Sequence, residues 1–343
     1  MNGNHFKDSF KGTISISLVQ EALHHAGMRG FNLNDLLMQA GIAPELLQSD
    51  KTRVSVSQYA QLWIVLADAM NDEFFGMDSH AMRRGSYTFL SQSVLQAEHA
   101  GQALSQILQF LNLLLDDFHS KYFVQENYAY IIIQDRAEPK RMFSYATYLM
   151  LIHGMMCWLC GQRVVLNRIQ LKCAEPEDDS DYKVRFCDDI QYHAEENYIQ
   201  FDASYLDIAI KQDKKSWHQF IRHTPYNLLV RFKNPNALSH QIRKHLIQTP
   251  TAEWAELAGL SQQFSMSEAT MQRRLKQEGV NFQQLKNDIR RDLAIDLLED
   301  GICTLQDISE KLNFHDVSAF HRAFKKWTGV SPGAYRQNKI QSL

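Results

Sequence analysis

The C-terminal third of the sequence repeats one short pattern of apolar and hydrogen-bonding residues. An offset of 49 residues superimposes the copies, and the aligned pairs are Met271 with Phe320, Arg273 with Arg322, Leu275 with Phe324 and Lys276 with Lys325. On a helix, the apolar positions share one face. The opposite face carries Ala269, Gln272, Arg273 and Lys276 in the first copy and Ser318, His321, Arg322 and Lys325 in the second. Arginine and glutamine suit guanine and adenine edges, so each copy predicts a helix that enters the major groove of DNA.

A shorter helix is expected before each of these two helices. The sequence predicts the shorter helices over residues 251–264 and 305–312, with tight turns at Ser265-Met266 and Asn313-Phe314. The helix boundaries are indicated by Thr251, Ser267, Gly279, the pair Thr304 and Asp307, and Pro332. The tail of the chain therefore predicts two helix-turn-helix units.

Residues 282–300, FQQLKNDIRRDLAIDLLED, predict a long helix between the two units. Its apolar stripe consists of Leu285, Ile289, Leu293 and Leu297. A helix of this length spans about 27 Å. It suits a spacer that holds two recognition helices about one DNA turn, roughly 34 Å, apart.

Three segments resemble the DNA-binding domain of AraC/XylS-type regulators: MQRRLKQEG, RRDLAIDLLEDG and FHDVSAFHRAFKKWTGVSPGAYR. The resemblance covers about residues 238–340, where the spacing, the aromatic pair and the closing GVSP coincide. It implies that the base-reading positions are Ala269, Gln272 and Arg273 in the first unit and Val317, Ser318, His321 and Arg322 in the second. The partners that it implies are a double-stranded DNA operator and RNA polymerase.

Two kinds of position depart from the usual pattern of that family. Ser265 and Asn313 stand at turn positions that are commonly glycine. Asparagine tolerates a left-handed backbone, whereas another L-residue loses about 1–2 kcal/mol there, so the first unit is expected to be less rigid. Ser261 and Ser309 stand where alanine is usual, which keeps the helix crossing close but adds a hydroxyl that needs a hydrogen-bond partner.

The upstream part of the chain mixes helical and strand patterns. Helical spacing relates Tyr59, Leu62, Trp63, Leu66 and Met70, and again Leu104, Ile107, Leu108, Leu111 and Leu115. The strand-like runs are KYFVQEN, YAYIIIQD, VVLNRIQLKC and NYIQFD. We therefore expect an α+β N-terminal sensor domain, followed by an all-α DNA-binding domain whose two helix-turn-helix units are joined by a long linker helix.

About residues 15–225 resemble the arabinose-binding-type sensor domain that is attached to some of these regulators. The segments that carry the resemblance are NLNDLLMQAGI, FFGMDSHAMRRGSYTFLSQSVLQA and AEENYIQFDASYLDIAI. It implies a domain that responds to a small-molecule effector and dimerises, without naming the effector. The aromatic and methionine content favours an effector that is partly apolar.

The length of 343 residues exceeds what one hydrophobic core usually holds, so two domains are expected. Residues 211–236 mix charge, prolines and a weak apolar pattern and are read as the connection. The expected boundaries are 1–225 for sensing and dimerisation, 226–237 for the linker and 238–343 for DNA binding. The last region carries 14 Lys and Arg against 12 Asp and Glu, whereas the remainder carries 22 against 27. The mildly basic region is therefore the one that the motifs assign to DNA.

The cysteines and the N-terminus bear on the cellular compartment. Five scattered cysteines, an odd number, make a poor disulfide framework and indicate a reducing environment. The first residues lack the basic start and continuous apolar run of a secretory signal. We expect a cytoplasmic protein.

Three upstream features allow both a functional and a plain interpretation. Cys157 and Cys160 share a helix face inside the run YLMLIHGMMCWLCG, which favours buried core thiols over a redox or metal pair. Tyr148 and His153 are candidate effector contacts, or else hydrogen-bonded core residues. The acidic run EPEDDSD lacks the ligand spacing of a calcium loop and predicts a solvated surface. Neither a metal nor a cofactor is expected.

Together these features predict a sequence-specific regulator of transcription, an activator and homodimer that responds to an effector held by the N-terminal domain. The alternative that the sequence leaves open is a constitutive regulator whose N-terminal domain only dimerises. An enzyme is not expected, because the N-terminal domain shows no nucleophile elbow, phosphate loop or set of metal ligands.

Overall fold

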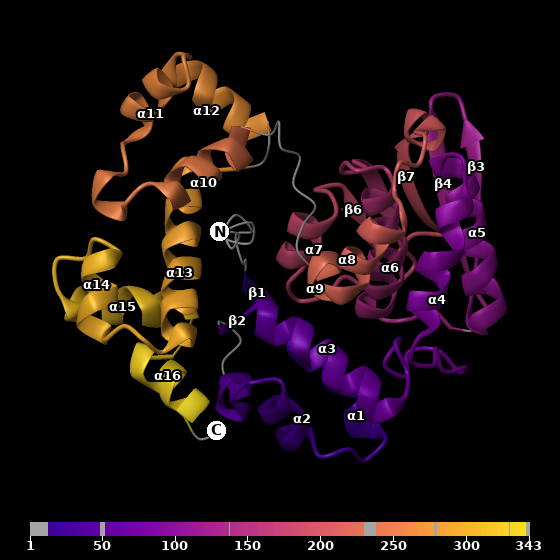
Figure 1. Ribbon diagram of the computed structural model, residues 1–343, viewed down its shortest axis with the longest axis horizontal. Helices are drawn as coiled ribbons and strands as arrows, with labels where there is room; N and C mark the ends of the chain where they lie inside the picture. The colour runs from indigo at the N-terminus through magenta and orange to yellow at the C-terminus, as the bar shows by residue number, and fades with distance from the viewer. Residues whose placement is uncertain are drawn as a thin grey trace. The chain divides into compact units, whose positions relative to one another are not determined.

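The computed structural model describes residues 13–48, 52–136, 138–229, 238–277, 280–328 and 330–340. It divides into two compact units (Figure 1). The first, which we call the C-terminal unit, holds Met1–Ile16, Gly41–Gln58 and Lys233–Leu343. The second, the sheet unit, holds Ser17–Ala40 and Tyr59–Phe232. The grouping of residues 1–16 and 41–58 with the C-terminal helices differs from the division at residue 225 that the sequence suggested.

The sheet unit is built around a five-stranded sheet with strand order β3-β4-β7-β5-β6. The strands are β3 (Phe118–Gln125), β4 (Tyr128–Asp135), β5 (Leu166–Gln170), β6 (Ile190–Gln191) and β7 (Asn197–Asp202). Neighbouring strands are antiparallel except β5 and β6, which are parallel. Ala129, Ile131 and Ile133 of β4 are buried because alternate side chains of a strand point to one face of the sheet. The four strand-like runs of the sequence are confirmed as strands of this sheet.

The sheet unit also contains helices. They are α1 (Ile16–Met28), α2 (Leu33–Gln39), α3 (Val56–Met70), α4 (Ser86–Ser93), α5 (Ala100–Leu114), α6 (Met142–Leu159), α7 (Ser180–Arg185), α8 (Lys214–Arg222) and α9 (Tyr226–Leu229). Helix α5 packs on β3 (Figure 1). The ring of Phe118 on β3 stacks on Tyr148 of α6 with centroids 5.2 Å apart, which joins the sheet to its central helix.

Helix α6 is the core helix of this unit. Among the residues that the structure describes, it is the helix long and apolar enough to cross a membrane, but 89% of its apolar window is buried inside the protein. It carries no charged residue, because it is surrounded by protein on all sides rather than on one.

The connection expected over residues 211–236 is partly folded. Helices α8 and α9 form inside it, and their side chains Trp217, Phe220 and Leu228 are buried in the sheet unit. The first part of this stretch is therefore helical, because its widely spaced apolar residues gather on one side of short helices.

The C-terminal unit is mainly helical. Its helices are α10 (Leu238–Gln248), α11 (Leu257–Gln263), α12 (Glu268–Gln277), α13 (Phe282–Asp300), α14 (Leu305–Lys311), α15 (Val317–Thr328) and α16 (Pro332–Ile340). A short antiparallel ribbon of β1 (Thr13–Ser15) and β2 (Arg53–Ser55) belongs to the same unit. The expected fold class, an α+β region followed by helices with two helix-turn-helix units, is confirmed.

Candidate nucleic-acid interface

The first helix-turn-helix unit consists of α11 and α12. The turn between them passes through Ser265, whose φ is 53°, a conformation that costs a non-glycine residue about 1–2 kcal/mol. Ser267 then caps α12, because its hydroxyl accepts a hydrogen bond from the backbone N–H of Thr270 at 3.2 Å. The left-handed turn and the cap expected from the sequence are confirmed, and they set the direction in which α12 leaves the turn.

Thr251 does not cap the first helix of this unit. It lies in a separate 3-10 turn, and α11 begins after Glu256. The hydroxyl of Thr251 donates to the carbonyl oxygen of Lys311 at 2.5 Å, so it is engaged away from any helix start. Gly279, the other boundary residue of this unit, lies outside the described residues.

Helix α12 has one buried and one exposed face. Met271 and Leu275 are 0% and 1% exposed. They belong to a core cluster with Leu238, Ile242, Leu246, Trp254, Leu260, Leu285 and Ile289. The exposed side chains include those of Glu268, Ala269, Gln272, Arg273, Arg274 and Lys276. Packing of the apolar face thus fixes which side chains α12 offers to solvent.

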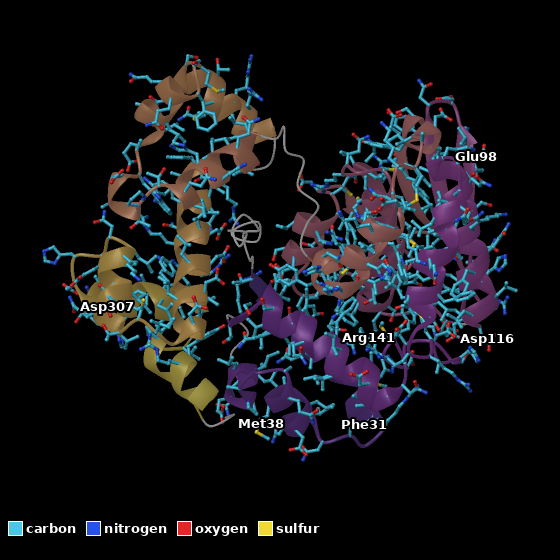
Figure 2. The ribbon with its side chains drawn as sticks, viewed as in Figure 1. Phe31, Met38, Glu98, Asp116, Arg141 and Asp307 are labelled. Atoms are coloured by element: carbon cyan, nitrogen blue, oxygen red, sulfur yellow. The ribbon has the colours of Figure 1, made fainter. Side chains whose placement is uncertain are left out.

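The second unit consists of α14 and α15. Thr304 and Asp307 form the expected capping box at the start of α14, each side chain bonding the other's backbone N–H; Asp307 is labelled in Figure 2. The turn between the helices passes through Asn313 with a φ of 56°. Asparagine tolerates this conformation better than serine does, so the second turn is less strained than the first.

Helix α15 repeats the arrangement of α12. Phe320 and Phe324 are fully buried. The ring of Phe320 lies 5.6 Å from that of Phe314, and the ring of Phe324 lies 5.6 Å from that of Tyr335 on α16. The exposed side chains are those of Ser318, Arg322, Lys325 and Lys326, while Val317 and His321 are half-buried. The aligned apolar pairs of the two repeats are therefore equally buried and the aligned arginines and lysines equally exposed, whereas His321 is half-buried where Gln272 is exposed.

The long helix α13 contacts the first unit through two cations. The ammonium of Lys286 is buried and lies 2.8 Å from the carboxylate of Glu256, and this hydrogen bond holds the pKa of Glu256 below its usual value. The guanidinium of Arg290 lies 5.0 Å from the centre of the Trp254 ring. Both contacts fix the start of the first unit against the spacer helix.

The predicted extent of α13 is confirmed, but its buried stripe is wider than predicted. Leu285 and Ile289 are buried as expected, whereas Leu293 and Leu297 are half-buried. The second half of the helix instead buries Asp292, Ala294, Ile295 and Leu298. The stripe changes direction because α13 packs against both helix-turn-helix units and against β2, which lie on different sides of it.

The two serines that replace the usual alanine differ in their hydrogen bonding. Ser261 and Ser309 are 4% and 1% exposed. The hydroxyl of Ser261 donates to the carbonyl oxygen of Ala258 at 2.8 Å. The hydroxyl of Ser309 has no hydrogen-bond partner among the described residues. The second unit therefore carries a buried donor whose desolvation is not compensated.

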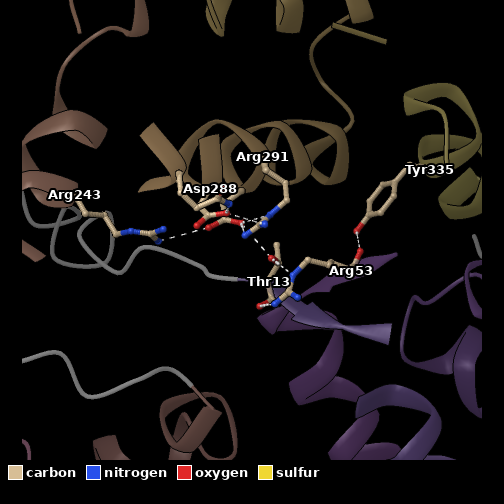
Figure 3. A network of polar contacts seen from close by, with 8 residues as sticks. Thr13, Arg53, Arg243, Asp288, Arg291 and Tyr335 are labelled. Carbon is tan, nitrogen blue, oxygen red and sulfur yellow. Dashed lines mark hydrogen bonds and ion pairs between the residues drawn. The ribbon is translucent and has the colours of Figure 1, made fainter. Parts of the chain in front are cut away.

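The ribbon of β1 and β2 is bonded to α13 through Asp292 (Figure 3). The hydroxyl of Thr13 donates to Oδ1 of Asp292 at 3.1 Å, and Nε of Arg53 donates to the Thr13 hydroxyl oxygen at 2.9 Å. Arg291 and Arg243 contact the same carboxylate at 3.1 and 3.5 Å. Sequence reasoning did not predict this set of contacts. The one feature that could have indicated it is Asp292, an acidic residue among the apolar positions of the linker helix.

The two candidate effector contacts are buried and have partners inside the protein. The hydroxyl of Tyr148 donates to Oγ of Ser120 at 2.8 Å. Nε2 of His153 lies 2.7 Å from the carbonyl oxygen of Val164 and 3.4 Å from Sγ of Cys157. The structure does not bring Tyr148 and His153 together at one pocket that it describes.

The cysteines and acidic residues were candidates for a metal site. Cys157 is buried and Cys160 half-buried, and both are free thiols whose pKa is raised by burial. In the described part of the chain, no group of three or more His, Cys, Asp or Glu side chains is arranged to hold a metal ion.

Two family descriptions match the chain. Residues 30–210 match the arabinose-binding domain of AraC transcription regulators, and residues 260–338 match a helix-turn-helix domain. The ornithine utilization regulator of Pseudomonas aeruginosa is 21% identical over 94% of this chain and 96% of its own length. The virulence regulon activator VirF of Shigella flexneri is 31% identical over 28% of this chain and 36% of its own.

A solved structure also resembles the chain. The transcriptional regulator CdpR of Pseudomonas aeruginosa is 19% identical, with 93% of this chain and 98% of that chain covered and a TM-score of 0.31. The first family match alone covers more than half of the sequence. The chain therefore belongs to the AraC family of DNA-binding transcription regulators, with an N-terminal domain of the arabinose-binding type.

Proposed function

We propose that the chain is a transcriptional activator that inserts α12 and α15 into two successive major grooves of a double-stranded DNA operator. The observation that supports this is the equivalence of the two helices. In each, the aligned apolar pair is buried and the aligned arginine and lysine are exposed. Two such faces on one spacer helix suit a site that repeats after one DNA turn.

The proposed roles follow from side-chain chemistry. The base-reading residues are Ala269, Gln272 and Arg273 in the first unit and Val317, Ser318, His321 and Arg322 in the second. Arginine pairs with both acceptors of a guanine edge, and the small residues let the helix approach the bases. Lys276 and Lys325 lie one turn further along and contact phosphates, which position the protein without reading sequence.

The remaining roles are assigned by region. Residues 1–225 bind a small-molecule effector and form the homodimer. Residues 238–343 bind DNA and contact RNA polymerase in the cytoplasm, and residues 226–237 connect the two regions. Tyr148 and His153 are effector contacts in this proposal, and the effector replaces their present partners. The chain is not an enzyme.

The alternative is a regulator that binds DNA constitutively and uses its N-terminal region only to dimerise. The two functions differ in one measurable property. A ligand that binds the folded state raises the melting temperature with its concentration. An effector-responsive regulator changes its operator affinity in the same titration, whereas a constitutive one does not.

The DNA-binding role is tested by the salt dependence of operator binding. Each phosphate contact contributes about −0.9 to the slope of log K against log salt concentration. Lys276→Ala and Lys325→Ala should each make the slope shallower by roughly 1. Lys121→Ala, which removes an exposed lysine of β3, is the matched control and should leave the slope unchanged. A flat salt response of the unaltered protein would contradict the proposal.

A further inference from the structure

Arg185, the last residue of α7, carries its charge into the interior of the sheet unit. The residue is 8% exposed. Its Nη2 donates to the carbonyl oxygen of Leu228 at 2.6 Å, and its guanidinium lies 5.6 Å from the centre of the Phe186 ring. Neither contact supplies a negative charge, and a buried cation without one is costly.

Most of the donors of this guanidinium have no partner in the described part of the chain. Nε and Nη1 of Arg185 are buried and make no hydrogen bond there. Burial lowers the pKa of Arg185 to about 10, and the side chains that act on its charge are Cys157, Arg163 and Tyr87. None of these three is a carboxylate. Buried donors are nearly always paired, so a donor set of this kind suits an acceptor that the described residues do not supply.

A second arginine acts on the same place. Nη2 of Arg163 donates to the carbonyl oxygen of Phe186 at 2.8 Å, and Nε of Arg163 is buried without a hydrogen bond among the described residues. The positive charge of Arg163 also disfavours the charged form of Arg185. A buried and a half-buried cation that repel each other are stabilised together by one anion that contacts both.

Helix α9 covers Arg185 with apolar side chains. Leu228 and Leu229 are 1% and 5% exposed. Leu228 packs closely on Gly154 of α6, since a Cβ at that glycine would lie 2.5 Å from Cδ2 of Leu228. Nearby, the ring of Tyr87 faces Phe220 at 6.4 Å. An apolar surrounding with a few polar groups is typical of small-molecule sites.

We propose that Arg185 and Arg163 form the binding site for an effector that has a carboxylate group and an apolar body. The proposal rests on the effector response proposed above and names its chemistry. The two oxygens of a carboxylate match the donor fork of a guanidinium and accept from the nitrogens that lack partners. The apolar body lies against Phe186, in the place that Leu228 fills in this structure.

The site is connected to the C-terminal unit by the chain itself. The Leu228 carbonyl bonds Arg185, so a carboxylate competes with α9 for the same guanidinium. Residues 230–237 follow α9, and α10 begins at Leu238. Displacement of α9 therefore moves the start of the segment that leads to the DNA-binding helices.

The test measures the melting temperature of the full chain with decanoate and with 3-phenylpropanoate, each against its primary amide. The amides keep the apolar body and lack the charge. We expect at least one carboxylate to raise the melting temperature by about 5 °C at saturation, and its amide to have no effect. Inorganic phosphate serves as a further probe, and a larger shift with phosphate than with either carboxylate would overturn the assignment to a carboxylate.

Variants separate a binding role from a structural one. Arg185→Met keeps the volume and removes the unpaired charge, so without ligand it should melt no lower than the unaltered protein. Arg185→Met and Arg163→Met should each weaken carboxylate binding by at least 10-fold. Arg168→Met is the control, because Arg168 is a half-buried arginine that is already paired with a carboxylate, Asp189, at 2.6 Å, and it should respond as the unaltered protein does.

Several results would overturn the inference. The first two are melting temperatures that rise equally with a carboxylate and its amide, or that rise with neither carboxylate. The other two concern Arg185→Met: carboxylate binding as strong as in the unaltered protein, or a melting temperature that falls by several degrees without ligand. Operator binding is measured in the same samples. If the unaltered protein binds its operator specifically but no carboxylate raises its melting temperature, only this inference is overturned. If the unaltered protein does not bind DNA specifically, the proposed function is overturned.

Discussion

Thr13 and Asp292 stand 279 positions apart in the chain, and the Thr13 hydroxyl donates to the buried carboxylate of Asp292 at 3.1 Å. The hydroxyl of Tyr335 also reaches this ribbon and donates to the carbonyl oxygen of Arg53 at 3.4 Å. The linker helix and the last helix are thus both bonded to a segment from the beginning of the chain. A C-terminal fragment that starts near residue 236 would lack these bonds.

We predict that Asp292→Asn destabilises the C-terminal unit. Asp292 is 2% exposed and is contacted by Arg243 and Arg291. Hydrogen bonds to charged groups contribute about 1.5–3 kcal/mol each, so the free energy of unfolding should fall by about 2–3 kcal/mol. Urea unfolding of the full chain measures this, followed by tryptophan fluorescence, to which Trp254 and Trp327 contribute from this unit.

Two further variants make the prediction specific. Thr13→Val should lower the free energy of unfolding by about 1 kcal/mol, because it removes one neutral hydrogen-bond donor. Asp300→Asn, at the exposed end of the same helix, should change stability by no more than about 0.5 kcal/mol. Equal effects of Asp292→Asn and Asp300→Asn would show that the buried carboxylate contributes nothing to this unit, and no effect of Thr13→Val would show the same of its bond to the ribbon.

The bond between Glu256 and Lys286 predicts a pH dependence. Lys286 holds the pKa of Glu256 below its usual 4.5. A carboxylate whose pKa is lowered by folding stabilises the protein above its unfolded pKa, and that stabilisation is lost as the pH falls through the folded pKa. Glu256→Gln should therefore be less stable than the unaltered protein at pH 7, by about 1 kcal/mol or less because Glu256 is mostly exposed.

The measurement is the gap in unfolding free energy between the two proteins at pH 7 and near pH 3. The gap should shrink at the lower pH. In a Lys286→Met background, Glu256→Gln should have little effect at either pH. A gap that persists unchanged into acid, or survives the loss of Lys286, would mean that Glu256 acts through something other than this bond.

Ser261 and Ser309 make a matched pair, because both are buried at equivalent positions and only Ser261 has a partner for its hydroxyl. Ser309→Ala removes an unpaired donor and should raise the free energy of unfolding by about 1 kcal/mol. Ser261→Ala gains the same helix propensity but loses a hydrogen bond, so it should be near neutral or destabilising. Chemical denaturation of the two variants side by side decides this, and a larger gain from Ser261→Ala would contradict it.

The sequence predicted the recognition helices well because local rules control them. The burial of Met271 and Phe320 follows from helical spacing, and the turn conformation at Ser265 and Asn313 follows from the motif. Capping depends on a few neighbouring residues, and it was confirmed for Thr304. It failed for Thr251, whose hydroxyl bonds a residue 60 positions away.

The rest of the site depends on pairings between distant segments, which spacing does not encode. Nothing near Thr13 in the sequence indicates that it contacts Asp292. Likewise, Tyr148 and His153 were predicted as effector contacts because they are polar groups in an apolar helix. Arg185 lies in a polar stretch that predicts an exposed side chain, and its burial results from α9, whose Leu228 lies 43 positions further along the chain.

The last prediction concerns how the two units read DNA. Arg273 and Arg322 are exposed at equivalent positions of α12 and α15. An arginine that pairs with both acceptors of a guanine discriminates by about 1–3 kcal/mol. Arg273→Ala and Arg322→Ala should therefore each relax base preference at one place in the operator, by roughly 5-fold to 150-fold, and the two places should lie about 10 base pairs apart.

Lys276→Ala is the matched comparison, because Lys276 is exposed on α12 only one turn from Arg273. If it contacts phosphate, its loss weakens all operator sequences alike and leaves base preference unchanged. Binding-site selection on the full-length variants measures these preferences position by position. If both arginine variants lost preference at the same base pair, the two helices would contact one subsite. If neither variant changed preference, the arginines would not read bases, because a residue that reads a base must alter selection at that base when it is removed.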